Sequence, residues 1–388
     1  MKILHITPFY PPSFGGISTH VSHLAKLTID SGNDFFVICP KDKTSTQKED
    51  PQSICRISSI FLPPWPYPTL QSVSIPLNLG YSINKFMKEV KPDIVHVHGH
   101  HYPICWAGLI ISKRQRIPNV LTLHGMYALN PAKVEGQTKF EEFFNNTVFK
   151  FLLNHTSAVI GLTNRITTYA YRYGKNKRTA YYTIPNGIET LPYKVNQSKK
   201  LLYRKKYGIK DNSIVILFRG RFEEVKGILE FCTAIIKLLE SFSEKIEIII
   251  VGDGTLKGKV NSIVKDKSQI HLLGWQPKSL IHELYILSDI FVMPSKFEAL
   301  PITIVEAMNA GLHIVYTPVG GIVEILDPYS NKTQINGPTV DHIYYGLKQV
   351  ISNSNYTRSD IESRKYAESL DWNSIFPNIF NIYQTLVN

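Results

Sequence analysis

The chain has 388 residues, of which 43% are hydrophobic and 19% charged, as in an ordinary globular protein. This length indicates two domains, each large enough to bury its own core. No apolar run approaches the roughly 18 residues needed to span a bilayer, and the chain does not begin like a signal peptide. Its four scattered cysteines form no Cys-x-x-Cys pair, which fits a reducing cytoplasm and excludes a cysteine-based structural zinc.

The formal net charge is +12, and most of it lies in the first half of the chain: +9 over residues 1–190 against +3 over residues 191–388. A positive surface attracts nucleic acid, acidic lipid head groups or a phosphorylated substrate. The alternative is a basic, solvated surface without a specific partner. Because the sequence shows no recognisable nucleic-acid-binding module, nucleic acid is not expected as a partner.

The first half alternates strand-like and helix-like segments. Five near-continuous apolar runs predict strands covered on both faces. In chain order they are KILHIT, DFFVICP, PDIVHVHG, NVLTLHG and AVIGLT. An amphipathic stretch between the first two, THVSHLAKLTIDSG, ends at Gly32 like a capped helix. This alternation predicts a parallel, doubly wound sheet.

A second alternation follows a polar, basic stretch at residues 190–206, and we place the linker at the beginning of this stretch. Its predicted strands are SIVILFRG, KIEIIIVG, IHLLG, DIFVMP and HIVYTP. We therefore expect two facing Rossmann-like domains with a cleft between them, at residues 1–190 and 191–370. The tail, residues 371–388, is expected to be helical and to pack on the N-terminal domain, with Trp372, Phe376 and Ile379 on its apolar stripe. Ligands of such sheets bind beyond the carboxyl ends of strands, at the switch point.

The loop after the first strand of the second half carries two cations in the stretch FRGRFEEVKG. Arg221 and Lys226 suit phosphate oxygens, and Gly220 and Gly227 keep the backbone close to a ligand. The alternative is a pair of solvated loop cations. The next loop, VGDGTLKG, lacks the spacing and the acidic residue of a dinucleotide site, so a nicotinamide cofactor is not expected.

Two glutamates, Glu298 and Glu306, stand eight positions apart in PSKFEALPITIVEAMNAG. The segment predicts a helix that begins near Pro301, and its free N–H groups, those of Ala299 and Leu300 among them, would attract phosphate. Carboxylates accept hydrogen bonds from vicinal hydroxyls. The combination favours a nucleotide sugar, with polyols on both sides of its phosphates. The alternative is that Glu298 caps the helix and Glu306 makes a surface pair.

These segments, together with PFYPPSFGGISTHV, HLLGWQP and IPNGIE, resemble the retaining glycosyltransferases of family four, which have the two-domain GT-B fold. The Glu298-x7-Glu306 spacing is that family's signature. The resemblance covers nearly the whole chain. It implies that Glu306 holds the ribose hydroxyls. It also implies that Glu298 meets the transferred sugar, supported by the backbone of Ala299 and Leu300.

The resemblance further implies that Arg221 and Lys226 neutralise the departing diphosphate. Gly15 and Gly16 would form a first-domain loop that closely approaches the phosphates. His124 would lie near the sugar. The implied catalytic residues are His124, Arg221, Lys226 and Glu298. The implied donor-binding residues are Gly15, Gly16, Arg221, Lys226, Glu298, Ala299, Leu300 and Glu306.

Metal-dependent glycosyltransferases of the other common fold use an Asp-x-Asp ligand. No Asp-x-Asp occurs in this chain, so a catalytic metal is not implied. No other cofactor is expected. The run HVHGHHY places His96, His98, His100 and His101 at a strand end. His96 and His98 point to the same face of the strand, but that is a weak ligand geometry. A loop that lines the cleft beside the acceptor is favoured over a metal site.

The acceptor side is expected in the aromatic and proline-rich segment at residues 61–68 and in the segment at residues 139–153. In the second segment Phe140, Phe144, Val148 and Phe151 are predicted on one helical face. That face is either a core stripe or a surface that dips into the membrane interface.

The sequence thus predicts a cytoplasmic hexosyltransferase, peripheral on the inner face of the membrane. It would transfer a hexose from a UDP- or GDP-linked donor to a lipid-linked or surface-glycan acceptor, in the synthesis of bacterial or archaeal cell-surface glycans. The basic first domain favours a membrane-bound, phosphate-bearing acceptor, with an anionic membrane surface as a further expected partner. Two alternatives remain: a nucleotide-sugar epimerase on the same fold, and a transferase with a small soluble acceptor.

Overall fold

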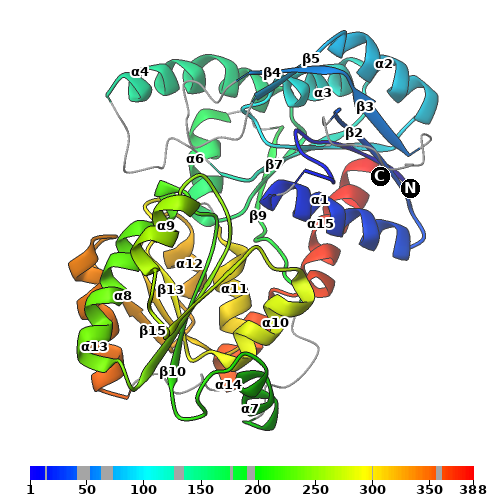
Figure 1. The fold of residues 1–388 in the computed structure, drawn as a ribbon. Coiled ribbons are helices and arrows are strands. Elements are labelled where there is room, and N and C mark those ends of the chain that lie inside the picture. Colours follow the sequence, from blue (N-terminus) through cyan, green and yellow to red (C-terminus); the bar gives the residue numbers. More distant parts are fainter. Residues whose placement is uncertain are drawn as a thin grey trace. The chain divides into compact units, whose positions relative to one another are not determined.

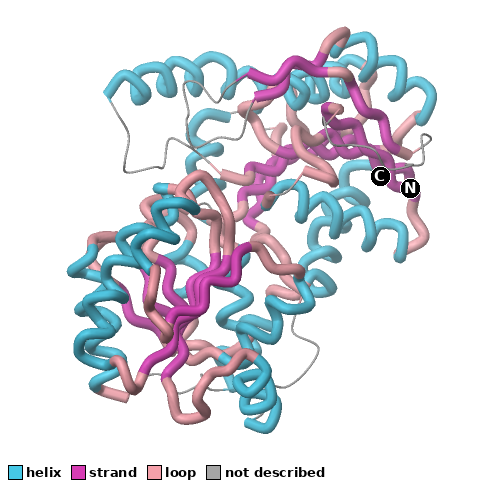
Figure 2. The backbone as a smooth tube through the Cα atoms, in the orientation of Figure 1, coloured by secondary structure: helices cyan, strands magenta, loops and turns pink. Residues whose placement is uncertain are grey.

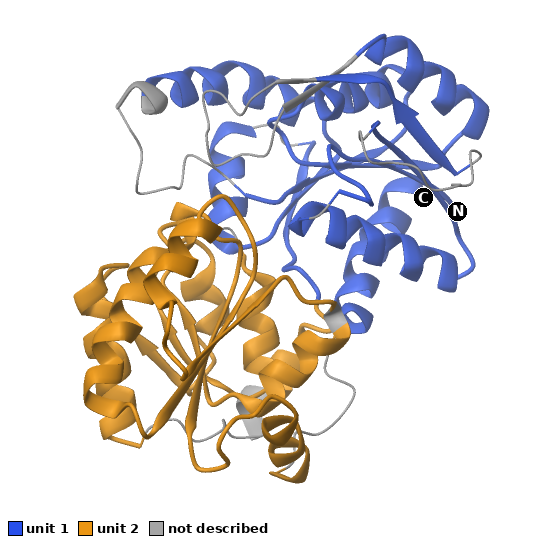
Figure 3. Ribbon diagram, viewed as in Figure 1, with its two compact units in different colours: residues 1–187, 372–388 blue, residues 188–371 orange. Residues whose placement is uncertain are grey.

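The computed structural model describes residues 1–13, 15–41, 53–62, 73–125, 135–174, 178–189, 197–298, 300–354 and 361–388. The chain divides into two compact units (Figure 3). Unit 1 comprises residues 1–187 and 372–388, and unit 2 comprises residues 188–371.

Unit 1 is built on a seven-stranded parallel sheet in the order β3-β2-β1-β6-β7-β8-β9. Its strands are β1 (Lys2–Ile6), β2 (Asp34–Pro40), β3 (Ile54–Ile57), β6 (Ile94–His98), β7 (Asn119–Leu123), β8 (Ala158–Gly161) and β9 (Ala180–Thr183). A separate antiparallel pair consists of β4 (Ser59–Leu62) and β5 (Val73–Pro76). Every residue of β6 and β7 is buried, because helices cover both faces of the sheet.

The helices of unit 1 follow the strands in alternation (Figure 1). They are α1 (Gly16–Asp30), α2 (Leu79–Val90), α3 (Pro103–Arg114), α4 (Glu135–Phe144), the π-helical turn Asn145–Phe149, α5 (Lys150–Asn154), α6 (Asn164–Gly174) and α15 (Trp372–Val387). The chain leaves α1 through Gly32, whose φ of 74° suits a residue without a Cβ. The C-terminal helix α15 packs on α1 and β6, where Trp372, Phe376 and Ile379 are buried.

Unit 2 has a six-stranded parallel sheet in the order β12-β11-β10-β13-β14-β15. Its strands are β10 (Ile214–Arg219), β11 (Ile246–Val251), β12 (Ile270–Gly274), β13 (Ile290–Met293), β14 (His313–Tyr316) and β15 (Lys332–Gln334). Figure 2 shows these strands flanked by helices.

The helices of unit 2 cover both faces of its sheet. They are α7 (Gln197–Lys206), the 3-10 turn Glu224–Lys226, α8 (Ile228–Phe242), α9 (Lys257–Val264), α10 (Lys278–Leu287), α11 (Ile302–Asn309), α12 (Ile322–Leu326), α13 (Val340–Ser352) and α14 (Ile361–Ser369). Alternate residues of β10, Ile214, Ile216 and Phe218, join the core formed with α8 and α13. The intervening residues therefore face α10 and α11, which places Arg219 on that side.

Two parallel α/β sheets of seven and six strands confirm the predicted fold class. The sequence did not predict β3, β4, β5, β9 and β15, which have only three or four residues each. The single stripe predicted at residues 139–153 is wrong, because Phe144 is buried whereas Phe140 and Phe151 are exposed. The π-helical turn between them is wider than an α-helical turn and shifts the buried face. Among the described residues, no helix is both long enough and apolar enough to span a membrane.

Candidate functional site

The strand order of unit 2 reverses between β10 and β13, and the loops that follow these two strands lie together. The amide of Lys296 donates a hydrogen bond of 2.8 Å to the carbonyl of Val225. Gly227 has a φ of 66°, and a Cβ added to it would lie 2.2 Å from the carbonyl oxygen of Pro294. Only glycine fits this contact without strain. The two loops thus form one surface at the switch point, where ligands of such sheets bind.

Glu298 and Lys226 form an ion pair on this surface. Lys226 Nζ lies 2.5 Å from Glu298 Oε1, and Ser295 Oγ donates to the same oxygen at 2.8 Å. The Glu298 side chain is only 8% exposed, so its charge would be costly without these partners. Oε2 of Glu298 makes no hydrogen bond with the described residues and remains as an acceptor for a ligand.

Glu306 belongs to a second charged group, with Arg219 at the end of β10 and Tyr285 on α10. Its Oε2 is bound by Arg219 Nη1 and, at 3.1 Å, by the hydroxyl of Tyr285. Burial alone would lower the pKa of Arg219, but the Glu306 carboxylate and the Tyr285 hydroxyl together outweigh burial and raise this pKa. Burial, followed by the charge of Glu306, raises the pKa of Tyr285, which therefore stays a neutral donor. Oε1 of Glu306 is left free of the described residues.

Arg221 differs from the other cations of the site. Its side chain is exposed and makes no hydrogen bond or ion pair with the described residues. Leu300 is buried in the loop before α11, and the start of that helix has no side-chain cap. Uncapped amides and an unengaged guanidinium are both suited to an anionic ligand. Ala299, also predicted here, lies outside the described residues.

The remaining predicted residues belong to unit 1. Gly15 precedes α1 with a φ of 145°, and a Cβ added to Gly16 would meet nothing within 4 Å, so this loop leaves room for a ligand. His124 follows β7 and lies near His98 and His20. Burial, and then the neighbouring His20, holds the pKa of His124 well below its usual range. His124 is therefore a neutral imidazole near pH 7.

Sequence reasoning missed three residues of the unit 2 site: Arg219, Tyr285 and Ser295. The sequence pattern places Arg219 only at the end of a predicted strand. One sequence feature could have identified Arg219 as a site residue. It is a charged residue in phase with Val215 and Leu217, at the carboxyl end of a strand that borders the switch point. Together the two ion pairs offer carboxylate oxygens for hydroxyl groups. Arg221 and the amides before α11 offer positive charge for phosphate.

Two family profiles match the chain. The profile described as "Glycosyltransferase Family 4" matches residues 14–190, and the profile described as "Glycosyl transferases group 1" matches residues 199–368. Together the two matches span most of the chain.

Three curated relatives illustrate the range of similar proteins. The uncharacterized glycosyltransferase MJ1607 of Methanocaldococcus jannaschii is 24% identical, over 99% of this chain and 98% of the relative. TuaC of Bacillus subtilis, a glycosyltransferase assigned to teichuronic acid biosynthesis, is 27% identical over 85% and 84%. The alpha-monoglucosyldiacylglycerol synthase of Acholeplasma laidlawii is 25% identical over 81% and 80%.

Solved structures share the fold over the full length. Sucrose-phosphate synthase from Thermosynechococcus elongatus superposes with a TM-score of 0.76 and 16% identity, covering 100% of this chain and 99% of the other. Anabaena Alr3699/HepE in complex with UDP-glucose superposes with a TM-score of 0.72 and 18% identity, covering 100% of both chains. The chain therefore belongs to family 4 of the glycosyltransferases, and it is a nucleotide-sugar-dependent glycosyltransferase of the GT-B fold.

Proposed function

We propose that this protein is a retaining hexosyltransferase that uses a UDP- or GDP-sugar and a lipid-linked or surface-glycan acceptor, in the synthesis of bacterial or archaeal cell-surface glycans. The observation that carries the donor assignment is the pair of cation–carboxylate contacts at the switch point of unit 2, Lys226–Glu298 and Arg219–Glu306. They place two carboxylates, each with one oxygen already bound by protein groups, beside a loop and a helix start that attract phosphate.

The donor would lie along this surface in a fixed order. Glu306 accepts hydrogen bonds from the ribose hydroxyls through Oε1, because Arg219 and Tyr285 already hold its Oε2. Glu298 accepts from the hexose through Oε2, since Lys226 and Ser295 hold Oε1. The diphosphate lies between them, near Arg221 and the backbone of Leu300. The backbone of Ala299 completes the expected donor contacts.

Breaking the bond between the anomeric carbon and the phosphate oxygen leaves positive charge on the sugar and additional negative charge on the diphosphate. Arg221, Lys226 and the amides before α11 stabilise the negative charge as it develops. The acceptor hydroxyl then attacks from the face that the diphosphate leaves, so the anomeric configuration is retained. The hydroxyl proton goes to the departing phosphate, and no protein side chain has to form a covalent bond to the sugar.

Unit 1 would bind the acceptor and contribute to the donor site. Gly15 and Gly16 are the phosphate contacts expected from unit 1, and His124 is its expected sugar contact, as a neutral imidazole that donates a hydrogen bond. A UDP-linked sugar is the first donor to test, because the HepE structure was solved with UDP-glucose.

An acceptor at a membrane is supported by an aromatic surface on α4 and α5. Phe140, Phe143 and Phe151 are 42, 65 and 48% exposed, and the exposed Lys150 lies among them in the sequence. Exposed aromatic rings beside basic side chains suit the boundary of an anionic bilayer. The names of two relatives, one assigned to teichuronic acid biosynthesis and one a glucosyldiacylglycerol synthase, point to similar acceptors.

The test is a donor screen followed by a transfer assay. UDP-, GDP- and ADP-sugars are compared by thermal shift, since a ligand of the folded state raises its melting temperature. The preferred donor is then incubated with membrane lipids or with a soluble sugar. With a donor labelled in its sugar, the label is expected in the lipid fraction. NMR of the product is expected to show that the anomeric configuration of the sugar is retained. Transfer only to the soluble sugar would overturn the acceptor assignment. Isomerised donor in the absence of any acceptor would indicate an epimerase instead.

A further inference from the structure

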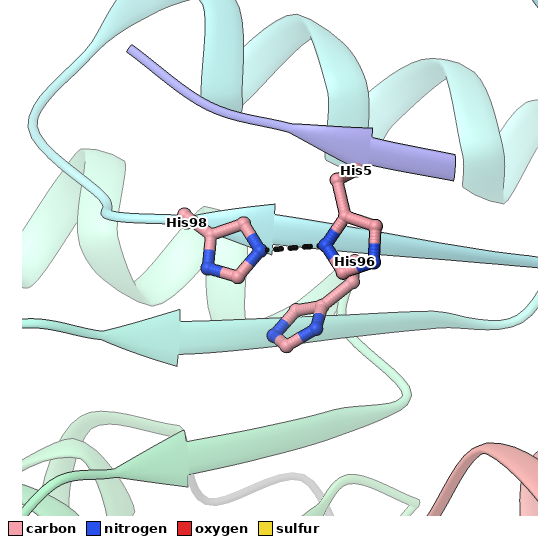
Figure 4. A group of neighbouring side chains, drawn as sticks. All are labelled: His5, His96 and His98. Carbon is pink, nitrogen blue, oxygen red and sulfur yellow. Dashed lines mark hydrogen bonds between the residues drawn. The ribbon is translucent and has the colours of Figure 1, made fainter. Parts of the chain in front are cut away.

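Five buried or half-buried histidines of unit 1 gather at the carboxyl ends of its central strands and on α1. They are His5 on β1, His20 on α1, His96 and His98 on β6, and His124 after β7. His96 and His98 share one face of β6, and His5 is paired in register with His96. Figure 4 shows the rings of His5, His96 and His98 grouped around this position, with His5 Nδ1 at 2.9 Å from His98 Nε2.

His20 is held by one ring nitrogen and leaves the other without a hydrogen-bond partner among the described residues. Its Nδ1 lies 2.9 Å from Oδ1 of Asn186, an acceptor, so Nδ1 carries the hydrogen and Nε2 carries a lone pair. The residue is 2% exposed, and its Nε2 is buried without a hydrogen-bond partner among the described residues. Metal-binding histidines characteristically donate their other N–H to a carbonyl in this way.

His98 and His124 supply two more nitrogens. His98 Nδ1 and His124 Nε2 are 3.2 Å apart. Two nitrogens bound at 2.0–2.1 Å to one tetrahedral zinc ion lie roughly 3.3–3.4 Å apart. The ligand nitrogens of His20, His98 and His124 all lie within 4.8 Å of one another, so small ring rotations would bring the three onto one ion.

We propose that His20, His98 and His124 bind one divalent transition-metal ion, with zinc, cobalt or nickel as the class of ion and a fourth position open to water. The three ligands are all imidazoles, which such ions prefer, whereas magnesium and calcium require oxygen ligands. His124 is only half-buried and gives the ion a route from solvent.

Two neighbouring histidines, His96 and His5, are hydrogen-bonded to residues around the site. His96 is engaged at both nitrogens, by Tyr383 at 2.5 Å and by Thr122 at 2.7 Å, so it has no nitrogen left for the ion. His5 fixes the second nitrogen of His98. His100 packs on Phe149 and lies apart from the three ligands in the contacts of the described residues. The site therefore takes one ligand, His98, from the HVHGHHY run, for which the sequence alone favours a loop that lines the cleft over a metal site.

The test measures metal directly and is independent of transferase activity. Untagged full-length protein is stripped with a chelator, exchanged into metal-free buffer and titrated with zinc. One ion per chain is expected by elemental analysis after gel filtration. Cobalt is expected to give the visible absorption of a tetrahedral nitrogen site. A wild-type chain that retains no ion and gives no cobalt spectrum overturns the proposal and leaves a hydrogen-bonded network of neutral histidines.

Variants locate the ion. His20→Gln and His124→Gln are each expected to lower zinc affinity at least 100-fold. Asn186→Ala is expected to lower it by about 10- to 100-fold, because it removes the partner that orients His20. His313→Gln is the matched control, a buried histidine of unit 2 with both nitrogens hydrogen-bonded, and should leave affinity unchanged. Folding is checked by circular dichroism. If His20→Gln fails to fold, the His124→Gln variant is used, because His124 is only half-buried. Unchanged zinc affinity in a folded variant overturns the assignment.

Discussion

The two units share a doubly wound architecture, yet the chemistry at their switch points is opposite. In unit 1 the carboxyl ends of β1 and β6 carry buried neutral imidazoles such as His5 and His98, and burial lowers the pKa of both. In unit 2 the ends of β10 and β13 lead to ion pairs formed by Glu298 and Glu306. The scaffold thus fixes where a ligand can bind, and the residues at the strand ends decide which ligand chemistry is accepted.

This difference has a simple physical origin. Unit 2 keeps charges in a partly buried place by pairing each carboxylate with one cation, so a charged donor can exchange contacts with groups that are already ionised. Unit 1 has no such pairs among the histidines named above, and burial favours their neutral form. Charge stabilisation of the leaving group is therefore expected from unit 2. Hydrogen bonding and metal binding are expected from unit 1.

The largest effect is expected from Arg221→Met in unit 2. Because the side chain is exposed and unengaged, its loss should leave the melting temperature unchanged. Turnover should nevertheless fall by roughly 100- to 1,000-fold, since one fixed charge at the leaving diphosphate is removed. Steady-state kinetics and a thermal melt test this. Lys257→Met, which removes an exposed cation paired with Asp253, is the control. Equal turnover in both variants would refute the role of Arg221.

The next effect concerns the pairing of charges in unit 2. Arg219→Met should destabilise the protein by about 2–3 kcal/mol, because it leaves the Glu306 charge without its partner. Adding Glu306→Gln should restore most of the stability without restoring donor affinity. Urea unfolding and calorimetric titration with the nucleoside diphosphate separate the two effects.

The same double-mutant cycle on the exposed Lys257–Asp253 pair should give a much smaller coupling energy, because solvent screens that pair. A coupling as small as this between Arg219 and Glu306 would show that the pair does not hold Glu306 in place.

Acid should weaken unit 1 more than unit 2. Burial lowers the pKa of His5 to about 3 and holds that of His100 well below its usual range. The unfolded chain therefore binds more protons below pH 6.5, and stability is lost as the pH falls toward the folded-state values. At pH 5 the loss from His5 alone is about 2 kcal/mol. Hydrogen exchange in the presence of a chelator at pH 7.5 and pH 5 should show β1 and β6 losing more protection than β10 and β11.

Unit 2 has its own buried histidine, His313, whose pKa burial also lowers, so a smaller acid response is expected there. Equal loss of protection in both units would indicate that the neutral histidines do not dominate the acid response of unit 1.

The smallest effect is expected at the aromatic surface of unit 1. Phe143→Ser should weaken binding to anionic vesicles by roughly 5- to 10-fold, because one exposed ring no longer enters the interface. Stability and transfer to a soluble sugar should not change. The control is Tyr81→Ser, another exposed aromatic of unit 1, located on α2. Vesicle sedimentation that does not distinguish the two variants would remove the support for a membrane surface here.

The sequence predicted well what depends on local pattern. Long apolar runs such as those of β10 and β11 identify strands that are covered on both faces, and their alternation with helices gives the parallel sheets. Short strands such as β15, with three residues, carry too little pattern to be recognised. The π-helical turn at Asn145–Phe149 changes the helical phase, which no simple periodicity predicts.

The site divides in the same way. Arg221, Lys226, Glu298 and Glu306 stand in recognisable motifs, and their roles stay predictions. Other contacts join residues that are far apart in the chain: Arg219 binds Glu306 across 87 positions, and His20 binds Asn186 across 166. Neither contact leaves a trace in the spacing of either residue. Only the packing of the folded units brings these side chains together.

The most direct test of the account is a crystal structure with the preferred nucleotide sugar bound. The account predicts the diphosphate beside Arg221 and the start of α11, the ribose at Glu306 and the hexose at Glu298. A donor bound away from residues 219–227 and 298–306 would contradict the assignment of the ion pairs in unit 2 to donor binding.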